Sequence, residues 1–464
     1  MTDDRMAVRS FVIEAQRGHL SSPIPLWRQL HAAASVLAGI RRGESATPAL
    51  ARVPAEVRPG AQALAFHVLR QLGRAEALRR QLATRAPPPA ADALLCTALA
   101  LAWQEEDAPY PPFTLVDQAV EAAKRFAETR NQQAFINACL RRFLRERDAL
   151  VAATESDPVV RWNHPGWWIA RLQQDHPDRW QEILEANNRP APMTLRVNLH
   201  RISRDPLRDL LRAGHIETEP VGQQGLILDR PHHVEAIPGF AEGLWSVQDA
   251  GAQLAAELMV PGLPEHARVL DACAAPGGKT AHICELAPTA QVLALDVDPV
   301  RCERIHQNLQ RLGLQAQVSA ADAGAPAAWW DGQPFDAILL DAPCTASGIV
   351  RRHPDVRWLR RESDIAQLAA QQKRLLTALW PLLKPGGRLV YCTCSVFRAE
   401  GDSQIAAFLA HNNTASLRPG PGHLLPRDGR SEGPLPDNRP SDHDGFFYAV
   451  LQKSALAAPA RLDD

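Results

Sequence analysis

The stretch RVLDACAAPGGKT, residues 268–280, decides the fold of the second half of the chain. An apolar run of strand length ends at Asp271, a loop of small residues follows, and a helical pattern begins at Lys279. Further apolar runs alternate with helical stretches as far as GRLVYCTCS, residues 387–395. Strand, helix and strand in this order predict a parallel sheet that helices cover on both faces.

Acidic residues end the first three predicted strands, at Asp271, Asp296 and Asp322. Ligands of such sheets bind beyond the carboxyl ends of the strands, where a carboxylate can accept hydrogen bonds from ribose hydroxyls. We expect Asp296 to do so and Asp322 to reach an adenine edge. Each aspartate alone could equally cap a helix. The glycine loop beside them is neither a Walker A loop nor G-x-G-x-x-G. The three aspartates together with this loop therefore favour a nucleoside-containing cofactor without a phosphate.

The loop after the first strand is the other half of this predicted cofactor site. Its glycines allow a tight turn and a close backbone approach, and the N-terminus of the following helix offers free N–H groups to a polar ligand. The predicted cofactor-binding residues of the loop are Cys273, Ala274, Ala275, Pro276, Gly277, Gly278 and Lys279.

Two cysteines follow the fourth and fifth predicted strands, in the sequences DAPC and TCS. A buried cysteine is usually a small hydrophobic residue, and that interpretation suits most of the other cysteines. Cys344 and Cys394 differ because they end neighbouring strands beside Asp341, at the edge where the cofactor loop lies. We therefore predict that these three residues carry the chemistry.

The remaining cysteine pattern predicts neither disulfides nor a metal site. Eight cysteines are spread over 464 residues without an export signal, which favours reduced thiols. Cys392 and Cys394 are only one residue apart, and no second cysteine or histidine pair at ligand spacing accompanies them.

The composition is that of an ordinary globular protein, with 45% hydrophobic and 22% charged residues. No apolar run reaches the roughly 18 residues that a membrane span needs. Because MTDDRMAVRS also lacks the layout of a secretion signal, we expect a cytoplasmic protein with no membrane partner. The formal net charge of -1 does not exclude a nucleic-acid partner, since the first 150 residues are basic and the remainder is acidic.

The chain before the predicted sheet divides into two parts. Residues 1–150 have helical periodicity from about residue 5 to residue 148, which predicts an all-α domain. Residues 151–244 favour a helical linker and a small α+β subdomain, and residues 245–455 form the α/β domain. The last helix of the first part carries Arg141 and Arg142 on one side, which suits either phosphate contacts or a solvated helix face.

A second basic cluster directly follows the DAPC sequence. It consists of Arg351, Arg352, His353, Arg357, Arg360 and Arg361, with Trp358 among them. Basic residues interleaved with an aromatic residue suit phosphate contacts and base stacking near an active site, so we predict RNA contacts here. A solvated helix start is the alternative.

Five sequences in order, DACAAPGGKT, LDVD, LLDAPCTASGIVRRHPDVRW, LKPGGRLVYCTCS and DGFFYA, resemble the motifs of RNA cytosine-C5 methyltransferases, and in particular the RsmB (Sun/Fmu) family. The helical pattern of the first part, with FINACLRRFLRE, resembles the NusB-like RNA-binding domain of that family. The resemblance implies three parts: an all-α NusB-like domain, a small α+β subdomain, and a C-terminal Rossmann-like α/β domain that binds S-adenosylmethionine.

The resemblance also implies roles for particular residues. Cys394 would be the nucleophile and Cys344 the helper that releases product. The glycine loop, Asp296, Asp322 and Asp341 would surround the methyl donor, with Asp341 also touching the target base. The implied substrate is 16S rRNA, with cytosine 967 in the reference bacterial numbering as the target. The oligomeric state stays open, with a monomer preferred.

The chain departs from the family pattern at three places. EGD from Glu400 stands where the family usually has Glu-Asn, QDAGAQ replaces the common QD-x-S-S-Q, and Cys392 adds a thiol beside the nucleophile. The first two put finer substrate contacts in doubt.

The chemistry of the base explains why such an enzyme needs a thiol. C5 of cytosine is too weak a nucleophile to take a methyl group until a nucleophile has added at C6. N3 then gains negative charge, which a hydrogen-bond donor or proton at the Asp341 carboxyl would stabilise. A base, for which we expect Cys344, must later remove the C5 proton. The target base must also leave its stack to be reached.

Three other functions remain open from the sequence. DAPC stands where amino-group methyltransferases carry an Asp/Asn-Pro-Pro-aromatic motif. A cytosine-C5 methyltransferase of the same superfamily could act on tRNA instead. A non-catalytic RNA-binding factor could keep a degenerate methyltransferase fold.

Overall fold

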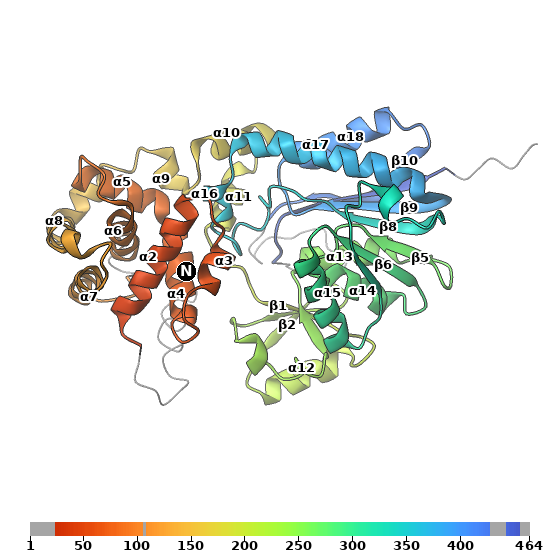
Figure 1. The fold of residues 1–464 in the computed structure, drawn as a ribbon, viewed down its shortest axis with the longest axis horizontal. Helices are drawn as coiled ribbons and strands as arrows, with labels where there is room; N and C mark the ends of the chain where they lie inside the picture. The colour runs from red at the N-terminus through yellow and green to blue at the C-terminus, as the bar shows by residue number, and fades with distance from the viewer. Residues whose placement is uncertain (1–23, 105–107, 427–441, 455–464) are drawn as a thin grey trace, which may run out of the picture. The chain divides into compact units, whose positions relative to one another are not determined.

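The computed structural model describes residues 24–104, 108–426 and 442–454 (Figure 1). The predicted helical pattern over residues 5–23 lies outside these ranges. The chain splits into two compact units, Met1–Arg189 with Val350–Arg360, and Pro190–Ile349 with Arg361–Asp464. Within the described ranges, no helix has both the length and the apolar character that crossing a membrane requires.

The first unit is built from helices around one buried helix, as predicted for an all-α domain. Every residue of α6 from Ala91 to Ala102 is buried. Because a helix that is apolar on all sides must be enclosed, α2, α4, α5, α7 and α8 pack around it. The helices of residues 24–189 are α2 (Leu26–Arg41), α3 (Ala46–Ala51), α4 (Arg58–Leu69), α5 (Leu72–Leu82), α6 (Pro89–Ala102), α7 (Pro112–Arg125), α8 (Gln133–Ala152), α9 (Pro158–Trp162), α10 (Gly166–Asp175) and α11 (Trp180–Asn187).

A segment from the second half of the chain completes this unit. Val350–Arg360, which contains α16 (Val356–Leu359), belongs to the first unit although the sequence on either side of it belongs to the second. Trp358 Nε1 donates to the carbonyl oxygen of Leu69 at 3.0 Å, and Asp355 Oδ2 accepts from the backbone N–H of Ala46 at 2.8 Å. The segment is therefore held by buried hydrogen bonds.

The burial of this segment corrects two predicted RNA contacts. Arg351 and Arg357 are only 2% and 0% exposed, and a phosphate contact requires an accessible guanidinium. Arg357 instead donates to the carbonyl oxygens of Asn163 at 3.0 Å and Asn187 at 2.6 Å. Two of the basic residues that the sequence pattern assigned to an RNA-binding surface are therefore buried in the unit instead.

The second unit begins with the small α+β subdomain that the sequence predicts. Its sheet has the order β2-β3-β1-β4 with all pairs antiparallel, and Leu207 and Leu211 on one side of α12 are buried. The boundary after Arg189 runs through the predicted middle region, residues 151–244, and assigns the sheet to the second unit. The elements are β1 (Thr194–Val197), α12 (Arg204–Ala213), β2 (Thr218–Val221), β3 (Gly225–Leu228) and β4 (Trp245–Val247).

The large sheet of the second unit has seven strands in the order β10-β11-β9-β8-β5-β6-β7. The prediction of a parallel sheet is confirmed for β5 to β9, whereas β11 pairs antiparallel with both β9 and β10. The strands are β5 (Arg268–Asp271), β6 (Gln291–Asp296), β7 (Gln317–Ala320), β8 (Phe335–Asp341), β9 (Leu383–Thr393), β10 (Ala415–Leu424) and β11 (Phe446–Lys453).

Helices cover both faces of this sheet, which makes the domain Rossmann-like (Figure 1). Alternate strand residues face opposite sides, so Leu270 and Ile338 pack in one apolar cluster with α17 while Val269 and Leu339 pack in another with α13. The carboxyl ends of the parallel strands remain between the two layers. The helices are α13 (Ala250–Met259), α14 (Gly278–Leu286), α15 (Pro299–Leu312), α17 (Glu362–Leu379) and α18 (Asp402–Ala410).

We expect Arg357→Ala to lower the free energy of unfolding of the first unit by about 3 kcal/mol. The substitution leaves the buried carbonyl oxygens that accept from Arg357 without this hydrogen-bond donor. Chemical denaturation with hydrogen exchange on first-unit peptides measures this change. His353→Ala is the matched control on the same segment, where His353 is exposed, and should cost less than about 0.5 kcal/mol. Equal stability of the two variants would show that Arg357 does not hold the segment.

Candidate active site

The loop between β5 and α14 lies at the carboxyl end of the sheet and has a fixed shape. Gly277 has a φ of 96°, and a Cβ there would meet Ile305 Cα at 3.1 Å, so only glycine fits without strain. The backbone N–H of Ala275 donates to Asp296 Oδ2 at 3.2 Å. Below the loop, Thr280 Oγ1 donates to Asp271, and burial raises the pKa of this aspartate to about 7. The loop residues are thus brought against Asp296 as predicted.

Two of the predicted cofactor acids pair with arginines. Arg301 Nη1 lies 3.4 Å from Asp296 Oδ2, and Asp296 is 4% exposed. Arg374 of α17 binds both oxygens of Asp322, at 3.0 and 3.1 Å, and this hydrogen bonding lowers the pKa of Asp322. Sequence reasoning missed Arg374, because nothing in the helical pattern of α17 says which of its side chains reaches a strand end.

The third acid, Asp341, holds a lysine and a thiol. Lys279 Nζ donates to Asp341 Oδ2 at 2.5 Å, and the Cys392 thiol donates to Asp341 Oδ1 at 3.3 Å. Burial acts to lower the pKa of Lys279, but the Asp341 carboxylate outweighs it and raises that pKa. Burial, together with Asp341, raises the pKa of Cys392 far above its usual value. Lys279 therefore stays a cation, and Cys392 a neutral donor, beside Asp341.

The two predicted catalytic cysteines lie side by side. Cys344 Sγ and Cys394 Sγ are 3.4 Å apart, a distance at which one thiol donates a hydrogen bond to the other sulfur. Both side chains are partly exposed. The hydrogen bond with Cys394 and then burial raise the pKa of Cys344 well above its usual value. Cys344 thus retains its proton.

Three loops are joined at this point by a close backbone approach. The N–H of Gly348 donates to the carbonyl oxygen of Cys394 at 2.9 Å, and the N–H of Gly445 donates to that of Gly348 at 2.8 Å. A Cβ on Gly348 would collide with the backbone of Gly445. This contact links the loops after β8 and β9 to Gly445, the residue directly before β11.

A buried ion pair connects the small sheet to the cofactor loop. Arg196 of β1 binds Glu285 of α14 through two hydrogen bonds, at 3.0 and 2.7 Å, and also donates to the carbonyl oxygen of Gly278 at 2.8 Å. The two side chains are 0% and 1% exposed. Sequence reasoning missed Arg196, although a charged residue inside the apolar strand TLRV is a signal that it needs a buried partner.

The structure shows the surroundings of two of the three departures from the family pattern, those at EGD and QDAGAQ. A Cβ at Gly401 would meet His423 at 2.5 Å, so glycine at this position makes room for the histidine. In QDAGAQ, Asp249 caps α13 by accepting from the N–H of Gly251 at 2.8 Å, and it also accepts from the N–H of Asp444. Asp249 therefore keeps a link between α13 and the segment before β11.

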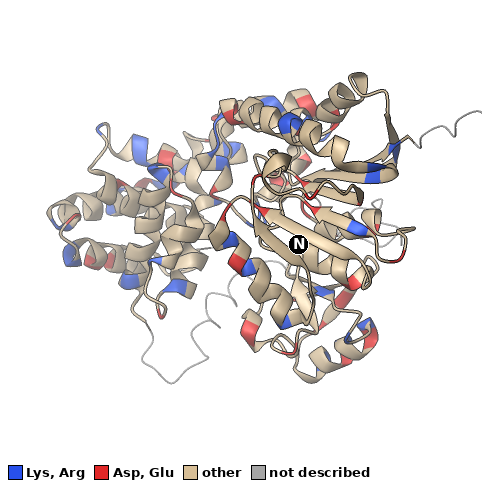
Figure 2. Cartoon of the chain, turned by 45° about the vertical axis from the view of Figure 1, so that its right-hand side comes forward, with Lys and Arg blue, Asp and Glu red and all other residues tan. Residues whose placement is uncertain are grey.

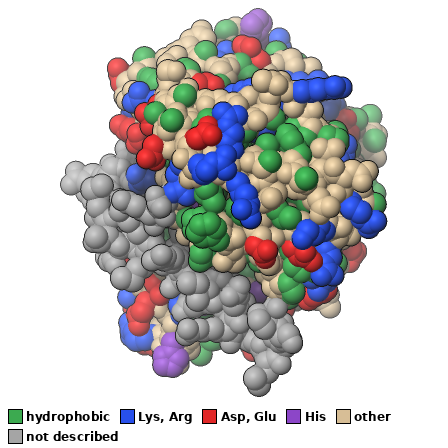
Figure 3. Space-filling view, turned by 90° about the vertical axis from the view of Figure 1, so that its left-hand side faces the viewer, with side chains coloured by type: hydrophobic (Ala, Val, Ile, Leu, Met, Phe, Trp, Pro, Cys, Tyr) green, Lys and Arg blue, Asp and Glu red, His purple; other side chains and the backbone are tan. Residues whose placement is uncertain are grey.

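Two of the predicted RNA-binding residues, both on α8, lie on the surface of the first unit. Arg141 and Arg142 of α8 are exposed, and Arg142 forms an ion pair with Glu146 at 2.9 Å. Figure 2 shows Lys and Arg distributed over the helices with Asp and Glu among them. Figure 3 shows a group of basic side chains near the middle of one face, with acidic ones around it. Arg352 is half-buried and His353 is exposed.

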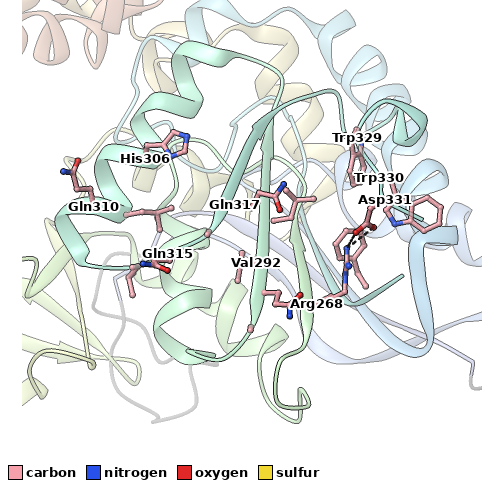
Figure 4. Close-up of a pocket in the computed structure, with 16 residues that line it drawn as sticks. Arg268, Val292, His306, Gln310, Gln315, Gln317, Trp329, Trp330 and Asp331 are labelled. Atoms are coloured by element: carbon pink, nitrogen blue, oxygen red, sulfur yellow. Dashed lines mark hydrogen bonds and ion pairs between the residues drawn. The ribbon is translucent and has the colours of Figure 1, made fainter. Parts of the chain in front are cut away.

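A groove of about 820 Å³ elsewhere in the second unit contains none of the predicted site residues (Figure 4). It lies at the amino ends of β5, β6 and β7, opposite the edge where the cysteines lie. Arg268 in this groove is neutralised by Asp331 at 2.8 Å, so it offers an anion little attraction. No described group of three or more His, Cys, Asp or Glu residues could hold a metal ion.

Comparison with known families matches each part of the chain. The family described as 16S rRNA methyltransferase RsmB/F matches residues 259–452. The ferredoxin-like domain of RsmF/B-like methyltransferases matches residues 164–235, and the NusB family matches residues 31–145. These matches fall on the α/β domain, the region of the small sheet and the all-α unit.

Individual relatives cover most of the chain. Ribosomal RNA small subunit methyltransferase B from Vibrio cholerae serotype O1 is 42% identical over 428 residues, which are 91% of this chain and 96% of the relative. The protein of the same name from Klebsiella pneumoniae subsp. pneumoniae is 47% identical over 348 residues, 74% of this chain and 78% of the relative.

Two solved structures are similar in fold. The crystal structure of PH0851 has a TM-score of 0.72 at 23% identity and covers 94% of this chain and 100% of its own. A methyltransferase homolog from Pyrococcus horikoshii has a TM-score of 0.53 at 31% identity and covers 64% of this chain and 98% of its own.

We expect Cys394→Ala to speed alkylation of Cys344 at pH 8 by about tenfold, because the pKa of Cys344 falls. Removing Cys394 removes the first cause that raises the Cys344 pKa, so the thiolate fraction of Cys344 grows. Peptide mass spectrometry after timed iodoacetamide treatment measures the rate. Cys392→Ala is the control and should leave it unchanged; a Cys344 rate that does not respond to Cys394→Ala would contradict the coupling.

Proposed function

The chain belongs to the RsmB/F family of 16S rRNA methyltransferases, and we propose that it methylates C5 of a cytosine in 16S rRNA through a covalent bond between Cys394 and C6. The proposed target is cytosine 967 in the reference bacterial numbering. The observation that carries the proposal is the pair of thiols 3.4 Å apart beside Asp341, at the strand ends where the cofactor loop also lies. Methyl transfer to an amino group would need no such pair.

The methyl donor that this reaction needs is S-adenosylmethionine, and the residues present fit it. A Cβ at Gly278 would meet nothing closer than Gln248 at 3.9 Å, so the backbone of the loop is open to a ligand. Val297 and Val300, which follow Asp296, are 71% and 68% exposed and offer an apolar surface to an adenine ring. We assign donor binding to the loop from Cys273 to Lys279 with Asp296, Asp322 and Asp341.

When bound, S-adenosylmethionine supplies an electrophilic methyl carbon, and the protein supplies the nucleophile that activates the base. The Cys394 thiolate forms a bond to C6, the C5–C6 π electrons become available at C5, and negative charge develops at N3. Lys279, 2.5 Å from Asp341, places a cation and a proton source next to the carboxyl that we assign to N3. C5 would then form its bond to the methyl carbon while the bond between that carbon and the sulfonium sulfur of the donor breaks, with S-adenosylhomocysteine as the leaving group.

The base that removes the C5 proton should stay protonated until Cys394 has added to C6. While Cys394 is free, it raises the pKa of Cys344 through their hydrogen bond. Addition to C6 turns Cys394 into a neutral thioether, which removes that effect, so Cys344 then ionises more readily. Cys344, directly or through a water molecule, takes the C5 proton, the C6–S bond breaks, and the Cys394 thiolate is regenerated.

RNA binding is assigned to the accessible basic residues alone. Arg141, Arg142, Arg352 and His353 are at least partly exposed, as phosphate contacts require. The first unit, which matches the NusB family, is the reason for proposing rRNA rather than tRNA as the substrate.

We expect Cys344→Ala to accumulate a protein–RNA adduct that survives a denaturing gel, whereas Cys394→Ala forms none. The first variant can add to C6 and transfer the methyl group but lacks the assisting thiol for release. Incubation with 16S rRNA and S-adenosylmethionine followed by denaturing electrophoresis measures the adduct. The opposite pattern would exchange the roles of the two cysteines.

We expect Asp296→Ala to weaken S-adenosylmethionine binding at least about tenfold, or about 1.4 kcal/mol, because it removes both a ribose acceptor and the partner of the loop backbone. Isothermal titration calorimetry measures the affinity. Asp331→Ala, an exposed ion-pair residue in the groove of Figure 4, is the control and should bind normally. Absence of binding by the unaltered protein would instead favour a non-catalytic RNA-binding factor.

A further inference from the structure

The buried carboxylate of Glu400 contacts the residue that follows each of the two cysteines in the sequence. Glu400 is 0% exposed. Its Oε1 accepts from the backbone N–H of Thr345 at 2.9 Å, and its Oε2 accepts from Thr345 Oγ1 at 2.5 Å and from Ser395 Oγ at 2.6 Å. Thr345 follows Cys344 and Ser395 follows Cys394 in the sequence, so one side chain ties both cysteine loops together.

The hydrogen bonds of Glu400 leave the carboxylate little capacity for anything else. Gln372 of α17 donates a fourth hydrogen bond, from Nε2 to Oε1 at 3.2 Å. A carboxylate has about four lone-pair sites, and these four donors occupy them. Burial raises the pKa of Glu400, and the bonds from Ser395 and Thr345 oppose the rise. The group is therefore enclosed and saturated, unlike an acid that exchanges protons with a substrate.

The main chain of Glu400 is held as firmly as its side chain. Tyr391 Oη donates to the carbonyl oxygen of Glu400 at 2.9 Å and to Gln372 Oε1 at 3.1 Å. Thr393 Oγ1 donates to the same carbonyl at 3.3 Å. Because β9 carries both Tyr391 and Thr393, Glu400 is fixed to the strand that ends at the nucleophile.

We propose that Glu400 is a positioning residue that holds Cys344 and Cys394 at the separation at which the second thiol can act on the adduct of the first. The inference rests on the proposed function for its catalytic meaning, but the geometry it asserts can be tested without methylation. Two loops from different strands have no covalent reason to keep their sulfur atoms 3.4 Å apart. The shared carboxylate adds a side-chain constraint to those that the register of β8 and β9 and the bond from Gly348 to Cys394 already provide.

Disulfide formation tests the geometry directly. Diamide oxidises two adjacent thiols to a disulfide and is itself reduced by the two electrons and two protons that they lose, so its rate reports how often the sulfurs meet. We expect Glu400→Ala to form the Cys344–Cys394 disulfide about tenfold more slowly than the unaltered protein. Mass spectrometry of the linked peptides measures the rate. Thr377→Val is the control, because its exposed hydroxyl on α17 donates only to the carbonyl oxygen of Lys373 in the same helix.

Activity then tests the catalytic meaning. We expect Glu400→Ala to lower kcat about a hundredfold, as a misplacement of about 1 Å does, with KM values nearly unchanged, and to accumulate the covalent adduct on normal RNA. Glu400→Gln can still bridge the two hydroxyls and should retain most of both the disulfide rate and kcat. A loss as large in Glu400→Gln would overturn positioning by hydrogen bonds.

The outcomes separate the two levels of the proposal. Unchanged disulfide formation in Glu400→Ala overturns the inference, whatever the activity. Slow disulfide formation without any methylation by the unaltered protein would refute the proposed function and leave the geometry standing. If Glu400→Ala does not fold, Thr345→Val and Ser395→Ala each remove one side-chain donor to the carboxylate, and each should slow the disulfide. Wild-type rates in both would overturn the inference.

Discussion

The register between β8 and β9 is the constraint on which the site depends. Asp341 lies opposite Cys392 in this parallel pair, so the residues that follow them leave the sheet at the same edge. Cys344 comes three residues after Asp341 and Cys394 two residues after Cys392, and their sulfur atoms end 3.4 Å apart. A slip of one residue would turn every side chain of one strand to the opposite face and separate the pair.

Around this pair, burial and pairing give similar groups different protonation states. Against the effect of burial, Asp341 at 2.5 Å raises the pKa of Lys279 and keeps the lysine charged, whereas burial keeps Cys392 neutral. Cys344 retains its proton through its neighbour as well as through burial. The protonation states of these groups are therefore set by their surroundings rather than by their residue type.

The sequence predicts much of this fold because strand and helix periods differ. The five parallel strands and the all-α unit appear where the pattern places them, and the acids and cysteines at strand ends are brought to one edge. The antiparallel strands β10 and β11 are not among the strands that the apolar pattern predicts. Likewise, Glu400 and Arg196 act through partners 55 and 89 residues away, which no local pattern can identify.

Arg351 and Arg357 show the limit of reading function from a basic cluster. Their charge suggested RNA, yet both are buried in the first unit. A run of arginines beside an aromatic residue occurs both in surfaces that bind phosphates and in buried segments held by hydrogen bonds. Only the burial of the side chains distinguishes the two cases. The two arginines lie in Val350–Arg360, a segment that belongs to the first unit although the chain on either side of it belongs to the second. In this segment the structural role is the one observed.

The central claim is that the Cys394 sulfur becomes bonded to the target base. The protein is incubated with S-adenosylmethionine and 16S rRNA that contains 5-fluorocytosine. Because fluorine replaces the hydrogen at C5, there is no C5 proton to remove, and the covalent complex is trapped. Tandem mass spectrometry of the digested complex then locates the modified residue. We expect the nucleotide on Cys394; its presence on Cys344 or Cys392, or methylation that proceeds with no trapped complex at all, would contradict the claim.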